Sequence, residues 1–322
     1  MKKIMILTIL LIPLQMLAQP DSTFIRKIEA LRTQGDYELI VKKLNIRHNK
    51  HPEELWTQYQ LACYYSLKGD NEHAFRNLYK AIKLKADGKD ILTDTDFENI
   101  HPTQQWQRVV DTLEQIYLSQ YPEISNKALS VELWHMYIED QRYRTLGKNY
   151  KKPKPEFRSP AQIEFNKKQQ AMIKARKKRL KKIIRKHGWP GHSMVGKEGS
   201  EAVFLIIQHA ESKYLKKYLP LLKEAAFAGE ASKKHYAMMY DRYLTRQGKK
   251  QVYGTQFTRD FIGLNEDGSP KFGKLVFHPI AEPETVNNRR AKMGMITVEE
   301  AAKKMGIEYD PNVNGKLEKM RY

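Results

Sequence analysis

The chain of 322 residues contains a single cysteine, Cys63, so no disulfide can form within it. Cys63 lies in the apolar, helix-like segment "LACYYSL", and we expect a buried small side chain rather than a reactive thiol. Several enzyme signatures are missing as well: the G-x-S-x-G turn, the P-loop, the H-E-x-x-H motif and paired C-x-x-C motifs. No short motif therefore indicates a reaction.

Long apolar runs are also scarce, and the main one lies at the N-terminus. Lys2 and Lys3 precede an apolar stretch at residues 4–17, which is followed by Ala18. This stretch is interrupted by Pro13 and is shorter than the roughly 20 residues that a membrane-spanning helix needs. The pattern predicts a signal peptide at 1–18, cleavage near Ala18–Gln19, and an exported mature chain, periplasmic or secreted, with no transmembrane segment.

Acidic residues are nearly absent from one segment, which carries most of the net charge of +20. Residues 148–187 hold sixteen lysines and arginines against Glu156 and Glu164, a net charge of +14. The segment contains a basic linker and a cationic helix, and a solvated helix face is one interpretation. The other is an anionic envelope surface, such as acidic lipid headgroups or glycans, as its partner. The predicted export argues against nucleic acid.

A sequence repeat with a period of 34 residues organises the first third of the chain. "QGDYELIVKKL" at 34–44 aligns with "KGDNEHAFRNL" at 68–78, which places Gly35 over Gly69 and Asp36 over Asp70. Helix, Gly-Asp turn and second helix at this period resemble tetratricopeptide repeats. We therefore predict tetratricopeptide-like helical hairpins with capping helices at 20–120, and a protein partner on the repeats.

The remainder, 121–322, is predicted to be a second, mainly helical domain with a small antiparallel β-hairpin. Ser159-Pro160 suits the start of the cationic helix, as N-cap and first helical residue. "HGWPGHSMVGKEGS" at 187–200 is expected to form a loop. The hairpin is expected to pair "QVYGTQF" at 251–257 with "KLVFHPI" at 274–280. Glycine within a strand often marks the close approach of a ligand or another backbone, which makes Gly254 a site candidate.

Polar residues in apolar surroundings supply the other candidates, because a buried polar group needs a partner. Asp140 lies on the apolar stripe of the helix at 128–146, Gln208 and His209 close an apolar helix, and the dipeptide Asp241-Arg242 interrupts an apolar run. Structural hydrogen bonds and ion pairs would explain each of these, and Arg289 and Arg290 are natural partners for Asp140 or Asp241. The spacing of His187, His192, His209 and His278 fits no helical metal pair, so we predict no metal and no cofactor.

The motif string "DQRYR", "GWPGHSMVG", "QHA", "DR", "YGTQ" and "RR" resembles an uncharacterised bacterial domain family of unknown function over about residues 127–310. The resemblance implies no activity. It implies that thirteen residues match family positions: Asp140, Gln141, Trp189, Gly191, Gly196, Gln208, His209, Asp241, Arg242, Tyr253, Gly254, Gln256 and Arg290.

These observations lead to a predicted polar pocket in the second domain, built from Asp140, His209, Asp241, Arg242, Gln256 and Arg290. Arginines and amides suit a ligand bearing carboxylate, phosphate or sugar hydroxyls. If the protein is an enzyme, His209 is the acid–base candidate, oriented by Asp241, and the reaction is hydrolysis or transfer on a polar envelope-derived molecule. Asp140 completes the catalytic candidates, and the ligand-binding candidates are Gln208, Arg242, Gly254, Gln256, Arg289, Arg290 and Trp189. The alternative is a non-catalytic interaction module whose polar residues form a closed buried network.

Overall fold

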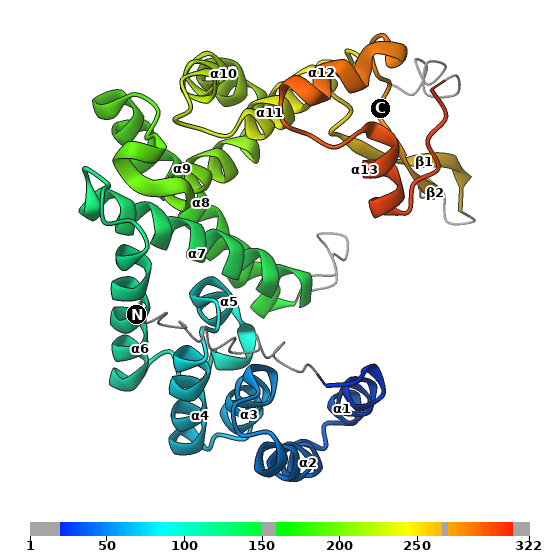
Figure 1. The fold of residues 1–322 in the computed structure, drawn as a ribbon. Helices are drawn as coiled ribbons and strands as arrows, with labels where there is room; N and C mark the ends of the chain where they lie inside the picture. Colours follow the sequence, from blue (N-terminus) through cyan, green and yellow to red (C-terminus); the bar gives the residue numbers. More distant parts are fainter. Residues whose placement is uncertain (1–19, 150–158, 266–269, 312–322) are drawn as a thin grey trace, which may run out of the picture. The chain divides into compact units, whose positions relative to one another are not determined.

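The computed structural model describes residues 20–149, 159–265 and 270–311 (Figure 1). The chain divides into two compact units, one ending at Tyr117 and the other beginning at Leu118. The predicted signal peptide and part of the basic linker, 150–158, lie outside the described residues. None of the helices in the described ranges has a segment long and apolar enough to cross a membrane.

The first unit is built from paired helices, and the same Gly-Asp turn connects the helices of two successive pairs. Its elements are α1 (Ser22–Gln34), α2 (Tyr37–Lys50), α3 (Leu55–Leu67), α4 (Asn71–Lys83), α5 (Gly88–Thr93), η1 (Thr95–Phe97) and α6 (Gln104–Ser119). Gly35 and Gly69 end α1 and α3 with positive φ angles of 74° and 81°, a conformation that favours glycine. Asp36 and Asp70 then cap α2 and α4 by accepting hydrogen bonds from backbone N–H groups. The Gly-Asp dipeptides therefore form equivalent turns.

Polar contacts attach the segment around η1 to these helices. Arg32 of α1 forms a two-pronged ion pair with Asp96, with N–O distances of 2.6 and 2.7 Å. The Ser66 hydroxyl of α3 donates to the backbone carbonyl of Asp96 at 2.7 Å. Cys63 is buried beside Asp94, and burial raises the pKa of its thiol. This raised pKa disfavours the reactive thiolate.

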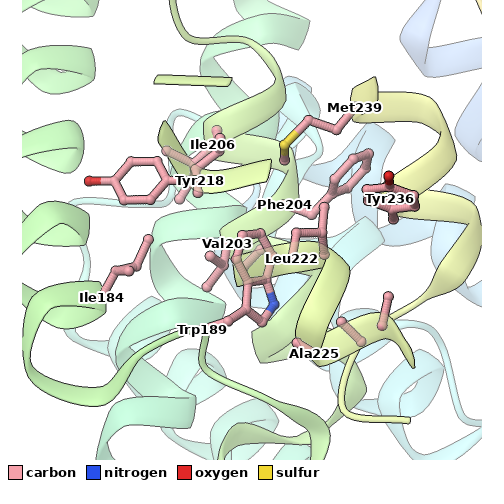
Figure 2. Close-up of a cluster of buried hydrophobic side chains, with 14 of the residues drawn as sticks. Ile184, Trp189, Val203, Phe204, Ile206, Tyr218, Leu222, Ala225, Tyr236 and Met239 are labelled. Atoms are coloured by element: carbon pink, nitrogen blue, oxygen red, sulfur yellow. The ribbon is translucent and has the colours of Figure 1, made fainter. Parts of the chain in front are cut away.

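In its described residues, the second unit contains five long helices followed by a hairpin and short helices. Its elements are α7 (Lys127–Asn149), α8 (Pro160–His187), α9 (His192–Gln208), α10 (Ser212–Phe227), α11 (Lys233–Thr245), β1 (Phe257–Leu264), β2 (Pro270–Phe277), η3 (Pro283–Thr285), α12 (Val286–Lys292) and α13 (Val298–Met305). The main core gathers side chains of α7 to α11, including Val203 and Phe204 from α9 and Leu222 from α10 (Figure 2). A mainly α fold with a small antiparallel hairpin is thus confirmed.

The cationic helix α8 begins where the sequence predicts. The Ser159 hydroxyl accepts from the backbone of Gln162, whose side chain accepts in return from the Ser159 N–H, and Pro160 is the first helical residue. Leu180, Ile183 and Ile184 bury one side of the helix in the core. Arg176 is buried with them, at 6% exposure, although the sequence did not predict a buried arginine in this helix.

The predicted loop at 187–200 is mostly helical, so that prediction is wrong. Helix α9 already begins at His192 and contains a kink at Gly196, whose φ is 74°. A Cβ there would lie 3.1 Å from the Tyr121 ring, so the kink and the packing both require glycine. The Gly and Pro residues suggested a loop because both residue types favour turns and loops locally. The kinked helix forms here because the segment is buried.

The prediction that "QVYGTQF" is a strand is also wrong. Strand β1 begins only at Phe257 and pairs antiparallel with β2, where Phe257 lies opposite Phe277. Residues 251–256 form a loop, in which Gln251 makes one isolated parallel bridge with Ile280. Part of the predicted turn between the strands, residues 266–269, lies outside the described residues. The loop is irregular because its polar groups bond to side chains rather than to a neighbouring strand.

Candidate functional site

The six residues of the predicted pocket fall into two groups in the second unit. Asp241, Gln256 and Arg290 bond to the loop at 251–256, which we call the polar loop. Asp140, His209 and Arg242 interact electrostatically with further arginines of α7, α8 and α11. We call Arg144, Arg176, Arg242 and Arg246 the arginine cluster.

Asp241 is fully buried and organises the polar loop. Its carboxylate accepts hydrogen bonds from the N–H groups of Val252 at 2.7 Å, Tyr253 at 3.0 Å and Thr255 at 3.0 Å. The Thr255 hydroxyl donates a further bond at 2.9 Å. Burial raises the pKa of Asp241 above its ordinary value, and these hydrogen bonds act in the opposite direction. Both carboxylate oxygens are thus occupied by the loop.

Arg290 binds the same loop from α12. Its guanidinium donates to the carbonyls of Tyr253 at 2.6 Å, Gly254 at 3.0 Å and Ile296 at 2.6 Å. Arg290 therefore uses backbone carbonyls as its direct partners, instead of the predicted ion pair with Asp140 or Asp241. Arg289 binds the carbonyl of Val252 at 2.8 Å. The two arginines satisfy carbonyls that the irregular loop leaves without strand partners.

Two glutamines complete the network of the polar loop. The Gln251 side chain accepts from the N–H groups of Thr255 at 2.7 Å and Gln256 at 2.8 Å. Its amide nitrogen donates to the carbonyl of His278 at 2.7 Å. Gln256 in turn donates to the carbonyl of Met238 at 3.3 Å. This closed network is the arrangement expected for polar residues that specify a fold.

Gly254 is required by backbone conformation and packing. Its φ is 64°, and an added Cβ would lie 3.0 Å from Ile280 Cδ1 and 3.3 Å from Val298 Cγ2. The space beside Gly254 is therefore filled by the protein. The expectation that this glycine clears room for a ligand is not supported, because it rested on a strand that does not form.

Two members of the arginine cluster contact the buried carboxylate of Asp140. Asp140 is 6% exposed and lies 2.5 Å from Arg144 Nε and 3.2 Å from Arg176 Nη1. Arg176 reaches it from α8, and burial lowers the pKa of its guanidinium while the Asp140 charge opposes that shift. The sequence signal for Arg176 was available, because it lies four residues from both Met172 and Leu180 on the apolar seam of α8.

Arg242 carries the least satisfied charge of this group. Its Nε is buried and has no hydrogen-bond partner among the described residues. Desolvation lowers the pKa of Arg242, and the charges of Arg246 and Arg144 lower it further. Arg246 donates to the carbonyl of Ala210. Arg242 therefore lies near the like charges of Arg144 and Arg246.

His209 caps the C-terminal end of α9 beside these charges, and its side chain is exposed. Partial desolvation and the charges of Arg144 and Arg242 lower its pKa to about 4, against the weaker opposing effect of Asp140. Because the ring is exposed, the neighbouring guanidinium groups are the cause that matters physically. His209 is accordingly a neutral imidazole at neutral pH.

The two remaining candidates lie in the core. Trp189 lies in the core, 8% exposed (Figure 2). Its Nε1 donates to the Ser200 hydroxyl at 3.2 Å. Gln208 is 5% exposed at the end of α9. Among the described residues, the group with metal-ligand spacing is Cys63, Asp94 and Asp96 in the first unit, and its carboxylates already accept from Tyr59 and Arg32.

Comparison with known proteins gives a family match but no activity. Residues 156–313 match the model of DUF6624, a family of unknown function. Arg176, His209, Arg242 and Arg246 lie within the matched residues, whereas Asp140 precedes them. Neither the curated proteins nor the solved structures gave a match.

Proposed function

We propose that the second unit binds a small anionic ligand, bearing a carboxylate or a phosphate, at the arginine cluster. The observation that carries this proposal is the excess of positive charge: Arg144 and Arg176 contact Asp140, the charges of Arg144 and Arg246 act on Arg242, and the buried Nε of Arg242 lacks a partner among the described residues. A partly buried cation without a counter-ion is costly, and guanidinium groups match the geometry of carboxylate and phosphate oxygens.

His209 gives this site a proton acceptor. With a pKa of about 4 the ring is neutral at neutral pH, so it can accept a proton or a hydrogen bond from a ligand. Hydrolysis or transfer on a polar, envelope-derived molecule would use His209 in this way. Asp241 does not suit the role of orienting group, because its oxygens already accept from the polar loop.

A titration with sulfate and with succinate tests anion binding. Arg242→Gln should weaken the affinity for both by tenfold or more, because one charge-assisted partner is lost. Arg185→Gln is the matched control, since Arg185 is an exposed cation of α8 outside the cluster. Calorimetry with glycerol as the neutral ligand completes the set. Equal weakening by both substitutions, or no saturable binding by the unmodified protein, would contradict the proposal.

The second candidate function is a non-catalytic interaction module. The closed network of the polar loop and the repeated Gly-Asp joints of α1–α4 favour it, because paired helices of this kind offer a face to a protein partner. On this reading, the first unit is a tetratricopeptide-like array and the arginine cluster is structural. Removing its charge excess with Arg242→Gln would then raise stability and leave the biological interaction unchanged.

We also propose that the mature protein is exported and that α8 faces an anionic envelope surface. The basic residues Lys2 and Lys3, the apolar run and Ala18 support export. Cationic side chains on the exposed positions of α8 support the surface interaction. N-terminal sequencing of protein recovered outside the cytoplasm should begin near Gln19, and recovery of the Met1 form there would contradict export.

A further inference from the structure

Two helices of the second unit, α8 and α10, meet along rows of lysines. Lys177 of α8 forms an ion pair with Glu211, which immediately precedes α10, at 3.6 Å. Its ammonium group also lies 5.6 Å from the centre of the Tyr214 ring of α10. Lys181, four residues further along α8, lies with Tyr214 and Tyr218 in the lining of one narrow hollow. The cations on this side of α8 therefore lie beside the first two turns of α10.

On α8 these cations follow the helix axis. Lys174, Lys177 and Lys181 are three and four residues apart, so they share one side of the helix. One helical turn rises about 5.4 Å, and the charges succeed one another at roughly that interval. Lys174 and Lys181 are exposed and form no ion pair among the described residues. The row therefore presents charges of one sign that the described part of the chain leaves largely unneutralised.

On α10, aromatic rings hold two further lysines. Lys213 Nζ lies 5.7 Å from the centre of the Tyr214 ring, and Lys217 Nζ lies 5.4 Å from the centre of the Tyr218 ring. A ring attracts an ammonium group without cancelling its charge, because the attraction comes from the quadrupole of the ring. Among the described residues, Glu211 is the carboxylate that pairs with these lysines, and it lies 2.6 Å from Lys213 Nζ. One carboxylate thus accompanies five cations, which we call the lysine face: Lys174, Lys177, Lys181, Lys213 and Lys217.

The lysine face differs from a surface that inserts into a membrane. Such surfaces combine cations with exposed apolar side chains that enter the bilayer. The exposed large apolar residues of α8 and α10 are Ile163 and Phe227. Ile163 lies eleven residues before Lys174, and Phe227 lies ten residues after Lys217. The lysine face itself is therefore polar and suits a hydrated partner.

A chain with regularly repeated negative charges fits these features better than a single anion. A linear polyanion along α8 meets one cation at each turn of the helix and reaches the cations of α10 beside it. Each contact strengthens the others because the anionic groups are joined in one molecule. Neutralising several lysines also releases their counter-ions, which favours association.

We propose that the lysine face binds a linear anionic polysaccharide with carboxylate groups on its repeating units. Export, as proposed above, brings the protein into contact with saccharides of the envelope and away from nucleic acid. The inference rests on the proposed interaction of α8 with an anionic envelope surface, and it specifies the partner and adds α10 to the surface. It uses no residue of the arginine cluster.

The test is a calorimetric titration of the full chain with polygalacturonate, with galacturonate as the single unit and dextran as the neutral polymer. Polygalacturonate should bind at least tenfold more tightly per carboxylate than galacturonate, because the chain contacts several lysines at once. Dextran should not bind measurably, because it carries no charge. Equal affinity per carboxylate for the polymer and the single unit would overturn the role of the chain.

Two double substitutions with the same change in charge locate the surface. Lys181→Gln with Lys217→Gln removes one cation from each helix of the lysine face and should weaken polygalacturonate binding by tenfold or more. Lys223→Gln with Lys234→Gln removes two exposed lysines of α10 and α11 outside the face and should leave binding unchanged. All four positions are exposed, so both variants should keep the melting temperature of the unmodified protein. Equal weakening by the two variants would show attraction by net charge alone and would overturn the proposal.

Vesicles separate this inference from the envelope interaction on which it rests. Vesicles of phosphatidylglycerol and phosphatidylcholine present negative charge on a lipid surface. Co-sedimentation with these vesicles, without binding to polygalacturonate, would overturn the polysaccharide and keep the proposed interaction of α8. Binding to neither probe would overturn both. Binding to polygalacturonate that depends on Lys181 and Lys217 would support the inference, whether or not the vesicles bind.

Discussion

The polar loop and the arginine cluster each involve one of two adjacent residues of α11, Asp241 and Arg242. The two sites differ in how these charges are satisfied. Asp241 accepts hydrogen bonds from four donor groups of Val252, Tyr253 and Thr255, three backbone N–H groups and one hydroxyl. Arg242, the next residue, has a buried nitrogen without a partner among the described residues. The first arrangement is complete within the chain, and the second has an excess of charge that an external anion can neutralise. Stability should therefore depend on Asp241, and ligand binding on Arg242.

The largest expected effect is at Asp241. Asp241→Ala removes the acceptor for three N–H groups and one hydroxyl, and it should lower the free energy of unfolding of the second unit by about 3–5 kcal/mol. Urea denaturation followed by tryptophan fluorescence measures this loss. Arg242→Gln, at the adjacent position, should change stability by less than about 1 kcal/mol. Similar losses for both variants would remove the distinction between the two sites.

Asp140 provides the next test, because its carboxylate already forms ion pairs with Arg144 and Arg176 of the arginine cluster. Asp140→Asn should cost about 3 kcal/mol, since it leaves the buried Arg176 without its ion pair. The same change should increase the affinity for sulfate, because the internal competitor for the guanidinium groups is gone. Unfolding curves with and without sulfate measure both effects. A variant that sulfate does not stabilise more than the unmodified protein would argue that the cluster is purely structural.

Gly254 tests whether the polar loop is as tightly packed as its contacts indicate. Gly254→Val should destabilise by about 1–3 kcal/mol, because the new side chain meets Ile280 and Val298 in addition to straining a positive φ. Gly248→Val is the matched control, with a φ of 68° and no atom within 4 Å of an added Cβ. The difference between the two variants in urea denaturation measures the packing contribution alone. Equal costs would show that the conformation, and not the packing, requires glycine at 254.

The smallest expected effect is the pH dependence of the second unit. His209 and His235 both have pKa values lowered to about 4, from about 6.5 in the unfolded chain. The unfolded state therefore binds more protons between these values, so stability is highest above pH 6.5 and falls as the pH decreases toward 4. His235→Phe keeps the stacking on Phe204 and should make this decline shallower. Urea midpoints measured from pH 7.5 to pH 4 test the slope.

Sulfate should modify this pH dependence through His209. A bound anion stabilises the imidazolium form, which raises the pKa of His209, so sulfate should bind more tightly as the pH falls from 7 to 5. His209→Gln should abolish the increase. A pH dependence that persists in this variant would assign the proton to another group.

Much of the local structure could be predicted because it depends on neighbouring residues. The Gly-Asp joints at 35–36 and 69–70 form the expected turns, and Ser159 forms the expected cap of α8. The errors occurred where distant side chains replaced local hydrogen bonds. The polar loop has the composition of a strand. Its backbone groups, however, form hydrogen bonds with the side chains of Asp241 and Arg290, which lie on helices outside the loop. The segment at 192–200 has the composition of a loop, but burial against Tyr121 makes it a kinked helix.

The mainly α fold, the repeated Gly-Asp turns and the residues that needed polar partners could be predicted from the sequence. The identity of those partners depended on how the helices and loops pack. Asp140 pairs with Arg176 from the middle of a cationic helix, and Asp241 pairs with a loop rather than with the adjacent Arg242. The physical reason is that turns and caps depend on residues three or four positions apart, whereas the cost of a buried charge depends on every group packed around it. The separation of one predicted pocket into a closed network and an open cationic cluster is a consequence of that packing.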